Sequence, residues 1–158
     1  MVDVGDTAPD FTAPVATGDV ESLTLSDAVE DGPVVLAFFP GAFTSVCTTE
    51  MCSFRDRLRA FEDVDATVYG VSTDSPFSLN EFRSQNDLSF GLVSDHEKDI
   101  IDAYRVRTSF DHIGLHGLAK RAVFVVDTDR TIAYAWVSDD PGVEPDYDEV
   151  ATAAHAAD

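Results

Sequence analysis

Apolar residues along the chain occur in short runs separated by polar turns, the arrangement typical of alternating strands and helices. The longest run, VVLAFF at 34–39, follows the turn sequence DGP and stops at Pro40. A continuous run of this length, bounded by turn residues, predicts a central strand that is buried on both faces. Shorter runs predict further strands at 67–71, 90–93, 122–126 and 131–137.

Helices are expected between these strands, and the pattern is clearest over residues 45–62. If this stretch is helical, one stripe along it carries the side chains of Cys47, Met51, Phe54, Leu58 and Phe61. Ser75 followed by proline predicts the start of another helix that runs to about residue 86, because proline favours the first turn. Shorter helices are expected at 23–29, where Ser26 would act as a cap, at 97–104 and at 148–156.

The remaining segments have a less regular pattern. Two prolines within residues 6–14 favour an extended chain that leads into a hairpin or loop around Gly18. Residues 107–120 are expected to be irregular, and 127–130 to form the turn between the last two strands. Strands that alternate with helices and end in a β-hairpin predict an α/β fold with a mixed central β-sheet, in a single domain over residues 1–158.

Acidic residues dominate the charge of the chain. It has 30 Asp and Glu against 10 Lys and Arg, a net charge of −20, and Lys98 and Lys120 are its only lysines. This balance argues against a nucleic-acid-binding role, because phosphate binding requires a basic surface. Self-repulsion on this scale destabilises the compact state in dilute salt, whereas molar salt screens it. We therefore expect a protein from a halophilic organism, and the alternative is an ordinary acidic cytosolic protein.

No targeting segment is expected at the start of the sequence. Residues 1–10, MVDVGDTAPD, have neither the basic start nor the apolar stretch of a secretory signal. The longest apolar run is far too short to cross a bilayer. We therefore expect a cytoplasmic protein with no membrane partner. In that compartment two cysteines are more often catalytic or redox-active than structural.

The two cysteines lie five positions apart at the start of the expected helix 45–62. Cys47 would lie in its first turn, directly after a strand and a Pro-Gly turn, where unpaired N–H groups and the helix dipole favour an anion. This position favours the thiolate, which is the nucleophilic form of cysteine. Cys52 would lie about 140° around the helix and off the apolar stripe, so packing alone does not explain it.

A disulfide between the two cysteines would require the helix to open. On an intact helix, Cα atoms five residues apart are separated by roughly 8–9 Å, whereas a disulfide requires less than about 7 Å. The bond is compatible with a cycle in which Cys47 becomes a sulfenic acid, the first turn and a half unwinds, and Cys52 condenses with it. A permanent disulfide within the helix and a thioredoxin-type exchange motif do not fit this spacing.

A metal site is not expected either. Zinc requires more ligands at recognised spacings than two cysteines and scattered histidines provide. We expect the histidines in loops or in the tail, at positions 96, 112, 116 and 155. The pair DHIGLH at 111–116 has a spacing of four but no convincing helix, so solvated side chains are the preferred interpretation.

The segment AFFPGAFTSVCTTEMC at 37–52 resembles the active site of the peroxiredoxins. The family's Pro-x-x-x-Thr-x-x-Cys signature is carried here by Pro40, Thr44 and Cys47. Other segments are also similar to the family: GDTAPDFTAP, YGVSTDSPFSLNEF, SDHEKDIIDAYRV and RAVFVVDTDRTIAYAWV. A second cysteine five positions after the first is similar to the PrxQ branch (bacterioferritin comigratory protein). The segment FFPGAFTSVC also resembles the AhpE-like branch, which commonly lacks that cysteine.

The resemblance implies a role for each matched residue. Cys47 would be the peroxidatic cysteine, with Pro40 shielding its thiolate and Thr44 hydrogen-bonding beside the sulfur and the peroxide. Arg121 would stabilise the thiolate and polarise the peroxide, and Glu50 would orient this arginine. The alternatives are a helix cap for Thr44, an ordinary first-turn acid for Glu50 and a surface arginine at position 121.

The resemblance further implies a thioredoxin-like fold and a thiol peroxidase that reduces hydrogen peroxide and organic hydroperoxides in antioxidant defence. Cys52 would resolve the Cys47 sulfenic acid, and a thioredoxin-like partner would reduce the resulting disulfide. No metal, flavin or haem would be required. Members of the family range from monomers through dimers to rings, so a homodimer is compatible with the sequence. The alternatives are a one-cysteine peroxidase resolved by an external thiol and a redox-sensing or holdase protein.

Overall fold

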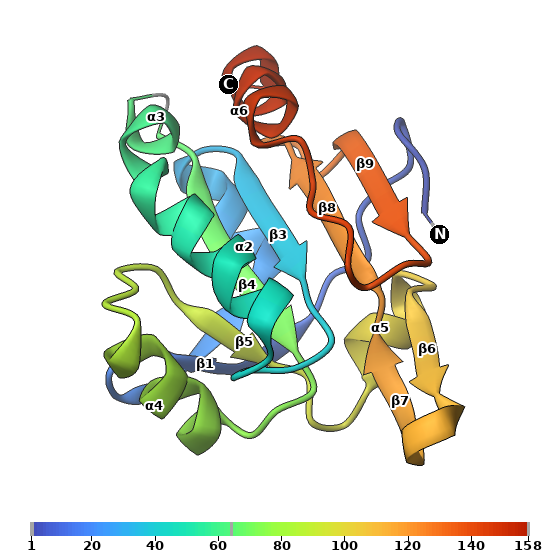
Figure 1. The fold of residues 1–158 in the computed structure, drawn as a ribbon. Coiled ribbons are helices and arrows are strands. Elements are labelled where there is room, and N and C mark those ends of the chain that lie inside the picture. The colour runs from blue at the N-terminus through green and yellow to red at the C-terminus, as the bar shows by residue number, and fades with distance from the viewer. Residues whose placement is uncertain (1, 64, 158) are drawn as a thin grey trace.

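A computed structural model describes residues 2–63 and 65–157, and its centre is a seven-stranded β-sheet (Figure 1). The strands lie in the order β2-β1-β5-β4-β3-β8-β9. Their bounds are Thr12–Ala16 (β1), Val20–Thr24 (β2), Val34–Phe38 (β3), Thr67–Ser72 (β4), Leu92–Ser94 (β5), Arg121–Val126 (β8) and Ile132–Ser138 (β9). The single-domain expectation covers three positions outside the described residues: 1, 64 and 158.

The pairing of the strands is mixed. β3, β4 and β5 run parallel, whereas β8 and β9 on one side and β1 and β2 on the other are joined by antiparallel pairs. β3 lies between β4 and β8, and all five of its residues are buried, as the continuous apolar run predicted. The mixed central sheet and the α/β class expected from the sequence are therefore confirmed.

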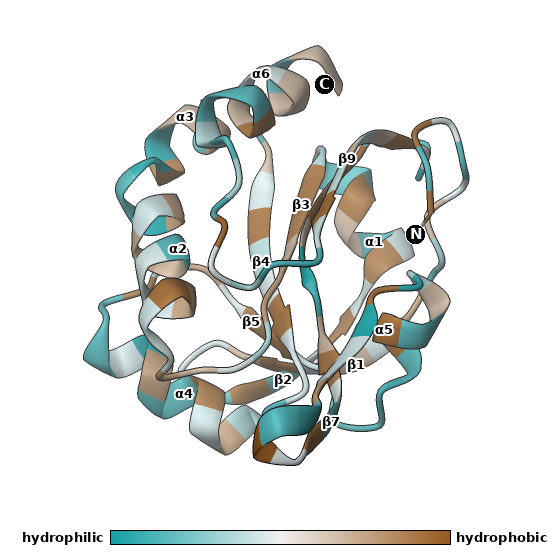
Figure 2. Ribbon diagram, turned by 45° about the vertical axis from the view of Figure 1, so that its right-hand side comes forward, coloured by the Kyte–Doolittle hydropathy of each residue, from teal (hydrophilic) through white to brown (hydrophobic). Residues whose placement is uncertain are grey.

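Helices cover both faces of this sheet (Figure 2). They are Leu25–Ala28 (α1), Ser45–Asp56 (α2), Leu58–Glu62 (α3), Pro76–Gln85 (α4), Asp99–Ala103 (α5) and Tyr147–Ala157 (α6), with short 3-10 turns at Val29–Asp31 (η1) and Asp111–Ile113 (η2). α1 and α5 pack on the face that carries Val34, Leu36 and Phe38. α2, α3, α4 and α6 pack on the face that carries Val35 and Ala37, because side chains alternate between the two faces of a strand.

The position of α2 over the sheet depends on a close approach at Gly70 of β4. A Cβ atom at this glycine would lie 3.0 Å from the Sδ of Met51 and 2.7 Å from a methyl group of Leu92. Any side chain at position 70 would therefore force Leu92 and Met51 to shift from these positions. Met51 and Phe54 are fully buried on this face, so the apolar stripe of the predicted helix fixes which side of α2 faces the core.

The helix predicted over residues 45–62 is not continuous. The backbone leaves helical geometry at Arg57, which separates α2 from α3, and Leu58 is only half-buried. The Arg57 side chain reaches α6, where it binds Asp148 at 2.6 Å. The break lets α3 change direction while Phe61 stays in the core, with its ring 6.1 Å from that of Phe54.

Two further expectations were wrong. Residues 107–120 are not irregular but form a hairpin of Arg107–Phe110 (β6) and Leu115–Ala119 (β7), which projects beside β8 (Figure 1). Its strands are largely exposed and contain a bulge, so they lack the alternating apolar pattern that identifies a half-buried strand. Ser26 is not a helix cap, because α1 begins at Leu25 with Thr24 in the capping position.

Candidate active site

Cys47 lies in the first turn of α2, on the side that faces the sheet. The chain reaches it from β3 through a buried Pro40 and a short loop, and α2 begins at Ser45. The Cys47 side chain is 1% exposed. Because the first turn of a helix has N–H groups without intrahelical partners, this position favours a negatively charged sulfur.

Arg121 reaches Cys47 from a distant part of the sequence because of the strand register. β8 pairs antiparallel with β3, and Ala122 lies opposite Phe38. The residue before Ala122 therefore lies beside the end of β3, where the chain turns toward α2. From there the guanidinium Nη2 donates a hydrogen bond to the Sγ of Cys47 at 3.0 Å.

The same guanidinium has two other partners. Its Nη1 donates to the Oε1 of Glu50 at 3.0 Å, and its Nε donates to the main-chain carbonyl of Pro141 at 3.0 Å. Glu50 lies three positions after Cys47 on α2, so both side chains are on the same face of the helix. Since the planar fork is held on three sides by α2 and by the chain after β9, its orientation toward the sulfur is fixed.

Burial determines the electrostatics of this group. Arg121 is 1% exposed and Glu50 is fully buried. Burial alone would lower the pKa of Arg121, but its Coulombic interactions and hydrogen bonds with Glu50 and Cys47 outweigh burial and raise this pKa. Burial raises the pKa of Glu50 to about 8, although the Arg121 charge and hydrogen bond act in the opposite direction. The Oε2 of Glu50 is buried and has no hydrogen-bond partner in the described structure.

Thr44 and Pro40 flank the sulfur-bearing turn. Thr44 occupies the N-cap position of α2, but its side chain makes no capping bond, and its exposed hydroxyl donates to the Gly41 carbonyl at 2.8 Å. An oxygen that donates in this way can still accept a bond from a bound molecule. The roles expected of Thr44 at the peroxide and of Pro40 as a shield stay predictions.

Asp74 supports the same turn and was missed in the sequence. Its Oδ2 accepts bonds at 2.8 Å from the backbone N–H of Ala42 and from the hydroxyl of Ser72. The turn includes Phe43 in a left-handed conformation (φ 68°), which a residue with a bulky side chain rarely adopts. The sequence contained a signal for this role, because Asp74 follows β4, and the carboxyl ends of neighbouring parallel strands meet at one edge of the sheet.

Cys52 lies on a different side of α2 from Cys47. Both cysteines are free, and Cys52 is half-buried. Its Sγ lies 3.7 Å from the Oδ1 of Asn86, which follows α4, and Arg55 of α2 donates to the main-chain carbonyl of Asn86 at 2.6 Å. Cys52 therefore lies off the apolar stripe, as the helical spacing predicted.

The histidines are spread over the surface rather than gathered. His116 lies in β7, not in a loop as expected, and its Nδ1 is 3.3 Å from the carboxylate of Asp111. Among residues 2–63 and 65–157, no three His, Cys, Asp or Glu side chains lie close enough together to hold a metal ion. None of the helices in the same ranges is long and apolar enough to span a bilayer.

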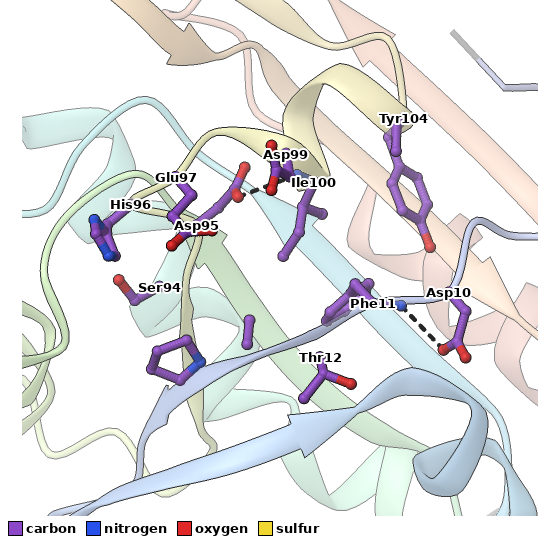
Figure 3. A pocket seen from close by; sticks show the side chains of 13 residues that line it. Asp10, Phe11, Thr12, Ser94, Asp95, His96, Glu97, Asp99, Ile100 and Tyr104 are labelled. Atoms are coloured by element: carbon purple, nitrogen blue, oxygen red, sulfur yellow. Dashed lines mark hydrogen bonds between the residues drawn. The ribbon is translucent and has the colours of Figure 1, made fainter.

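A cavity of about 480 Å³ opens between β1 and α5 (Figure 3). The acidic and histidine side chains that line it are Asp10, Asp95, His96, Glu97 and Asp99. Asp95 is buried and accepts the first N–H groups of α5, those of Ile100 and Ile101. Neither cysteine is among its lining residues, so this cavity is separate from the thiol site.

Comparison with known proteins gives a consistent result. The profile of the AhpC/TSA family matches residues 4–135. The chain is 38% identical over 144 residues to a chloroplastic 2-cysteine peroxiredoxin of Chattonella marina var. antiqua, which covers 85% of this chain and 70% of that protein. It is 37% identical over 128 residues to a Mycobacterium tuberculosis protein named as a peroxiredoxin, which covers 81% and 80% of the two chains.

A solved structure shows the same likeness in three dimensions. The crystal structure of peroxidoxin BcpB from Mycobacterium tuberculosis superposes with a TM-score of 0.84 at 32% identity, over 99% of this chain and 98% of that chain. The similarity therefore includes the sheet and the helices on both of its faces. The thioredoxin-like α/β fold implied by the sequence is confirmed.

Proposed function

The chain belongs to the AhpC/TSA family of peroxiredoxins, and from this membership we propose that it reduces hydrogen peroxide and organic hydroperoxides through the sulfur of Cys47. The observation that carries the proposal is the 3.0 Å contact between the Sγ of Cys47 and the Nη2 of a buried Arg121. A guanidinium in this position stabilises a thiolate and leaves the sulfur oriented at the mouth of α2.

In the first step, the Cys47 thiolate attacks one oxygen of the peroxide. A sulfur–oxygen bond forms as the oxygen–oxygen bond breaks, so the sulfur is oxidised to a sulfenic acid and the second oxygen leaves as an alkoxide or hydroxide that takes up a proton. Negative charge develops on both oxygens during this step. Arg121 and the N–H groups of the first turn of α2 are the donors that would stabilise it, while the hydroxyl of Thr44, which donates to the Gly41 carbonyl, would accept a hydrogen bond from the peroxide.

In the second step, the thiol of Cys52 condenses with the Cys47 sulfenic acid, which forms a disulfide and releases water. The two sulfurs lie on different sides of α2, so the first turns of this helix must open before the bond can form. The Chattonella relative is named as a 2-cysteine peroxiredoxin, which supports the participation of a second cysteine. A dithiol protein of the thioredoxin type would then take up the disulfide and restore both thiols.

A one-cysteine reaction is the second candidate. The contact of Cys52 with Asn86, on the flank of α2 rather than at its mouth, favours it, because an external thiol could reach Cys47 without any opening of the helix. The resemblances to the PrxQ and AhpE-like branches differ in the same respect, because the AhpE-like branch commonly lacks the second cysteine. A redox-sensing or holdase protein would use the same oxidation but would not require repeated turnover.

Repeated turnover is therefore the decisive measurement. With excess thioredoxin and its reductase, the native chain should consume many equivalents of peroxide, and the Cys47→Ser variant should consume none beyond the uncatalysed rate. A protein that stops after one equivalent, with intact reductant still present, would be a sensor rather than a peroxidase. Mass mapping of the peroxide-treated chain, with and without thiol blocking, would show whether positions 47 and 52 become linked.

A further inference from the structure

At the thiol site, two buried acidic groups accept hydrogen bonds from one buried cation, Arg121. Arg121 donates to Cys47 through Nη2 and to Glu50 through Nη1, each at 3.0 Å. All three side chains are 1% exposed or less. If both acids were ionised, the group would have a net charge of −1 in a place where water cannot solvate it, and burial of an uncompensated charge is strongly unfavourable.

We propose that Cys47 and Glu50 hold one proton between them, and that Glu50 carries it whenever Cys47 is a thiolate. Glu50 is then a neutral acid that receives a hydrogen bond from Arg121 and leaves the positive charge of the guanidinium to the sulfur. In this state the site as a whole is neutral. Ionisation of Glu50 would give the site a net charge of −1. Glu50 therefore acts on the reaction through Arg121, as a positioning residue.

The hydrogen bonds at Glu50 support this assignment of the proton. A buried carboxylate that stays ionised usually accepts two or three hydrogen bonds from donors. Glu50 accepts one, from Arg121, and its second oxygen is buried with no partner in the described part of the chain. The helix N–H groups that favour an anion lie at the mouth of α2, closer in sequence to Cys47 than to Glu50.

A neighbouring acid outside the group of three acts in the same direction. Glu144, in the loop before α6, adds a like charge that raises the pKa of Glu50. Tyr147 of α6 faces the same region, and its hydroxyl donates to Glu144 at 2.6 Å. Arg121 is the only cation that acts on Glu50 among the described residues, and it is already bonded to Cys47. The raised pKa of Glu50, about 8, agrees with this geometry.

The consequence for the reaction rests on the proposed function. Below the pKa of Glu50 the carboxyl is neutral, and the positive charge of Arg121 is left for the sulfur and the peroxide. Above it, a second negative charge next to Arg121 opposes the charge that develops on the peroxide oxygens. At an effective dielectric constant of about 20, a unit charge about 6 Å away changes a rate by at least about tenfold, so we expect an alkaline decline of that size.

The primary test uses infrared spectroscopy to detect the proton on the Glu50 carboxyl. In infrared spectra of the reduced protein near neutral pH, the difference between the native chain and Glu50→Gln should contain the carbonyl stretch of one protonated carboxylic acid. In Cys47→Ser, where Arg121 has no second anion to bind, the same band should titrate at lower pH than in the native chain. A native chain without this band at neutral pH, or a band whose titration Cys47→Ser leaves unchanged, would overturn the proposal.

A kinetic test follows the pH profile. Over the range from about pH 7 to about pH 9.5, peroxide reduction by the native chain should fall by about tenfold, whereas in Glu50→Gln the ratio of the two rates should stay within about twofold. Glu149→Gln, at an exposed acid of α6, is the matched control and should keep the native decline. Loss of peroxidase activity at every pH would contradict the proposed function, while the infrared band would still decide where the proton lies.

Discussion

Arg121 and Cys47 are 74 positions apart in the chain, yet the Nη2 of the arginine lies 3.0 Å from the Sγ of the cysteine. The antiparallel register of β8 with β3 brings the arginine to the end of β3, and the turn at Pro40 brings the cysteine to the start of α2. The contact is therefore a property of the fold, and its geometry can be tested by substitution.

Replacement of Arg121 by lysine should reduce the rate of peroxide reduction by roughly 10²–10³-fold, as expected when an oriented donor to developing negative charge is lost. A lysine keeps the charge, but it cannot hold a planar fork against Cys47, Glu50 and the Pro141 carbonyl at the same time. Second-order rate constants from stopped-flow mixing with hydrogen peroxide would measure the loss. Arg107→Lys, at an exposed arginine paired with Asp102, should change the rate by less than twofold.

Replacement of Cys52 by serine should separate the two steps of the cycle. The first equivalent of peroxide should react at close to the native rate, because Cys52 does not contact Cys47 or Arg121 in the described structure. Thioredoxin-dependent turnover should then fall to a small fraction of the native value. Single-turnover and steady-state measurements on the same preparation would show this. Native turnover by Cys52→Ser would establish the one-cysteine mechanism instead.

Replacement of Arg55 by alanine should speed disulfide formation between the two cysteines. Arg55 holds the part of α2 that carries Cys52 against Asn86, through a hydrogen bond of 2.6 Å to its main-chain carbonyl. Loss of this bond frees Cys52 to move toward Cys47 once the first turns have opened, and a hydrogen bond of about 1 kcal/mol corresponds to a roughly fivefold faster approach. Rapid quenching after one equivalent of peroxide, followed by mass analysis, would measure the rate. Arg59→Ala, at an exposed arginine of α3, is the control, and a slower or unchanged rate in Arg55→Ala would contradict the prediction.

The stability of the chain should depend on pH through Glu50. Burial raises the pKa of this carboxyl to about 8 from an ordinary value of 4.5, so the folded state keeps a proton that the unfolded state releases. Between these two pH values the folded state binds more protons, and the free energy of unfolding falls as pH rises. Urea unfolding at a series of pH values should show a steeper decline for the native chain than for Glu50→Gln. Equal slopes would mean that Glu50 is ionised in the folded protein.

The stability of the chain should also depend strongly on salt. With a net charge of −20, the folded state is opposed by its own repulsion in dilute buffer. Added KCl should raise the midpoint of thermal unfolding steeply up to about 1 M, where the screening length is about 3 Å. The same titration near pH 4.1, the isoelectric point, should show a much smaller effect. A midpoint that does not change with salt at neutral pH would argue against a halophilic origin.

The sequence predicted those features that leave a local pattern. The buried strand at 34–39, the helix start at Ser75 and the final hairpin around 127–130 were all visible as apolar runs, a capping pair or a turn. The positions of Cys47 and Arg121 followed from a motif and from a resemblance. The exposed hairpin of β6 and β7 left no such pattern, because its strands bury little apolar surface.

Other parts of the site could not be predicted because they depend on contacts over long sequence distances. The break at Arg57 coincides with a contact to Asp148, 91 positions away. Asp74 supports the turn before α2 through a backbone N–H that is 32 positions away. The pKa of Glu50 depends on how many donors reach it after folding, which no spacing along a helix can reveal.

One of the three anchors of Arg121 is a main-chain oxygen, that of Pro141. Every residue type has such an oxygen, so the identity of the side chain there matters less than the path of the backbone. The length of the segment between β9 and α6 thus sets the position of the carbonyl that holds the guanidinium. Many different sequences could form this segment, provided that their length is kept. Insertion or deletion of one residue in this surface segment would shift the cation away from the sulfur without altering a single side chain of the site.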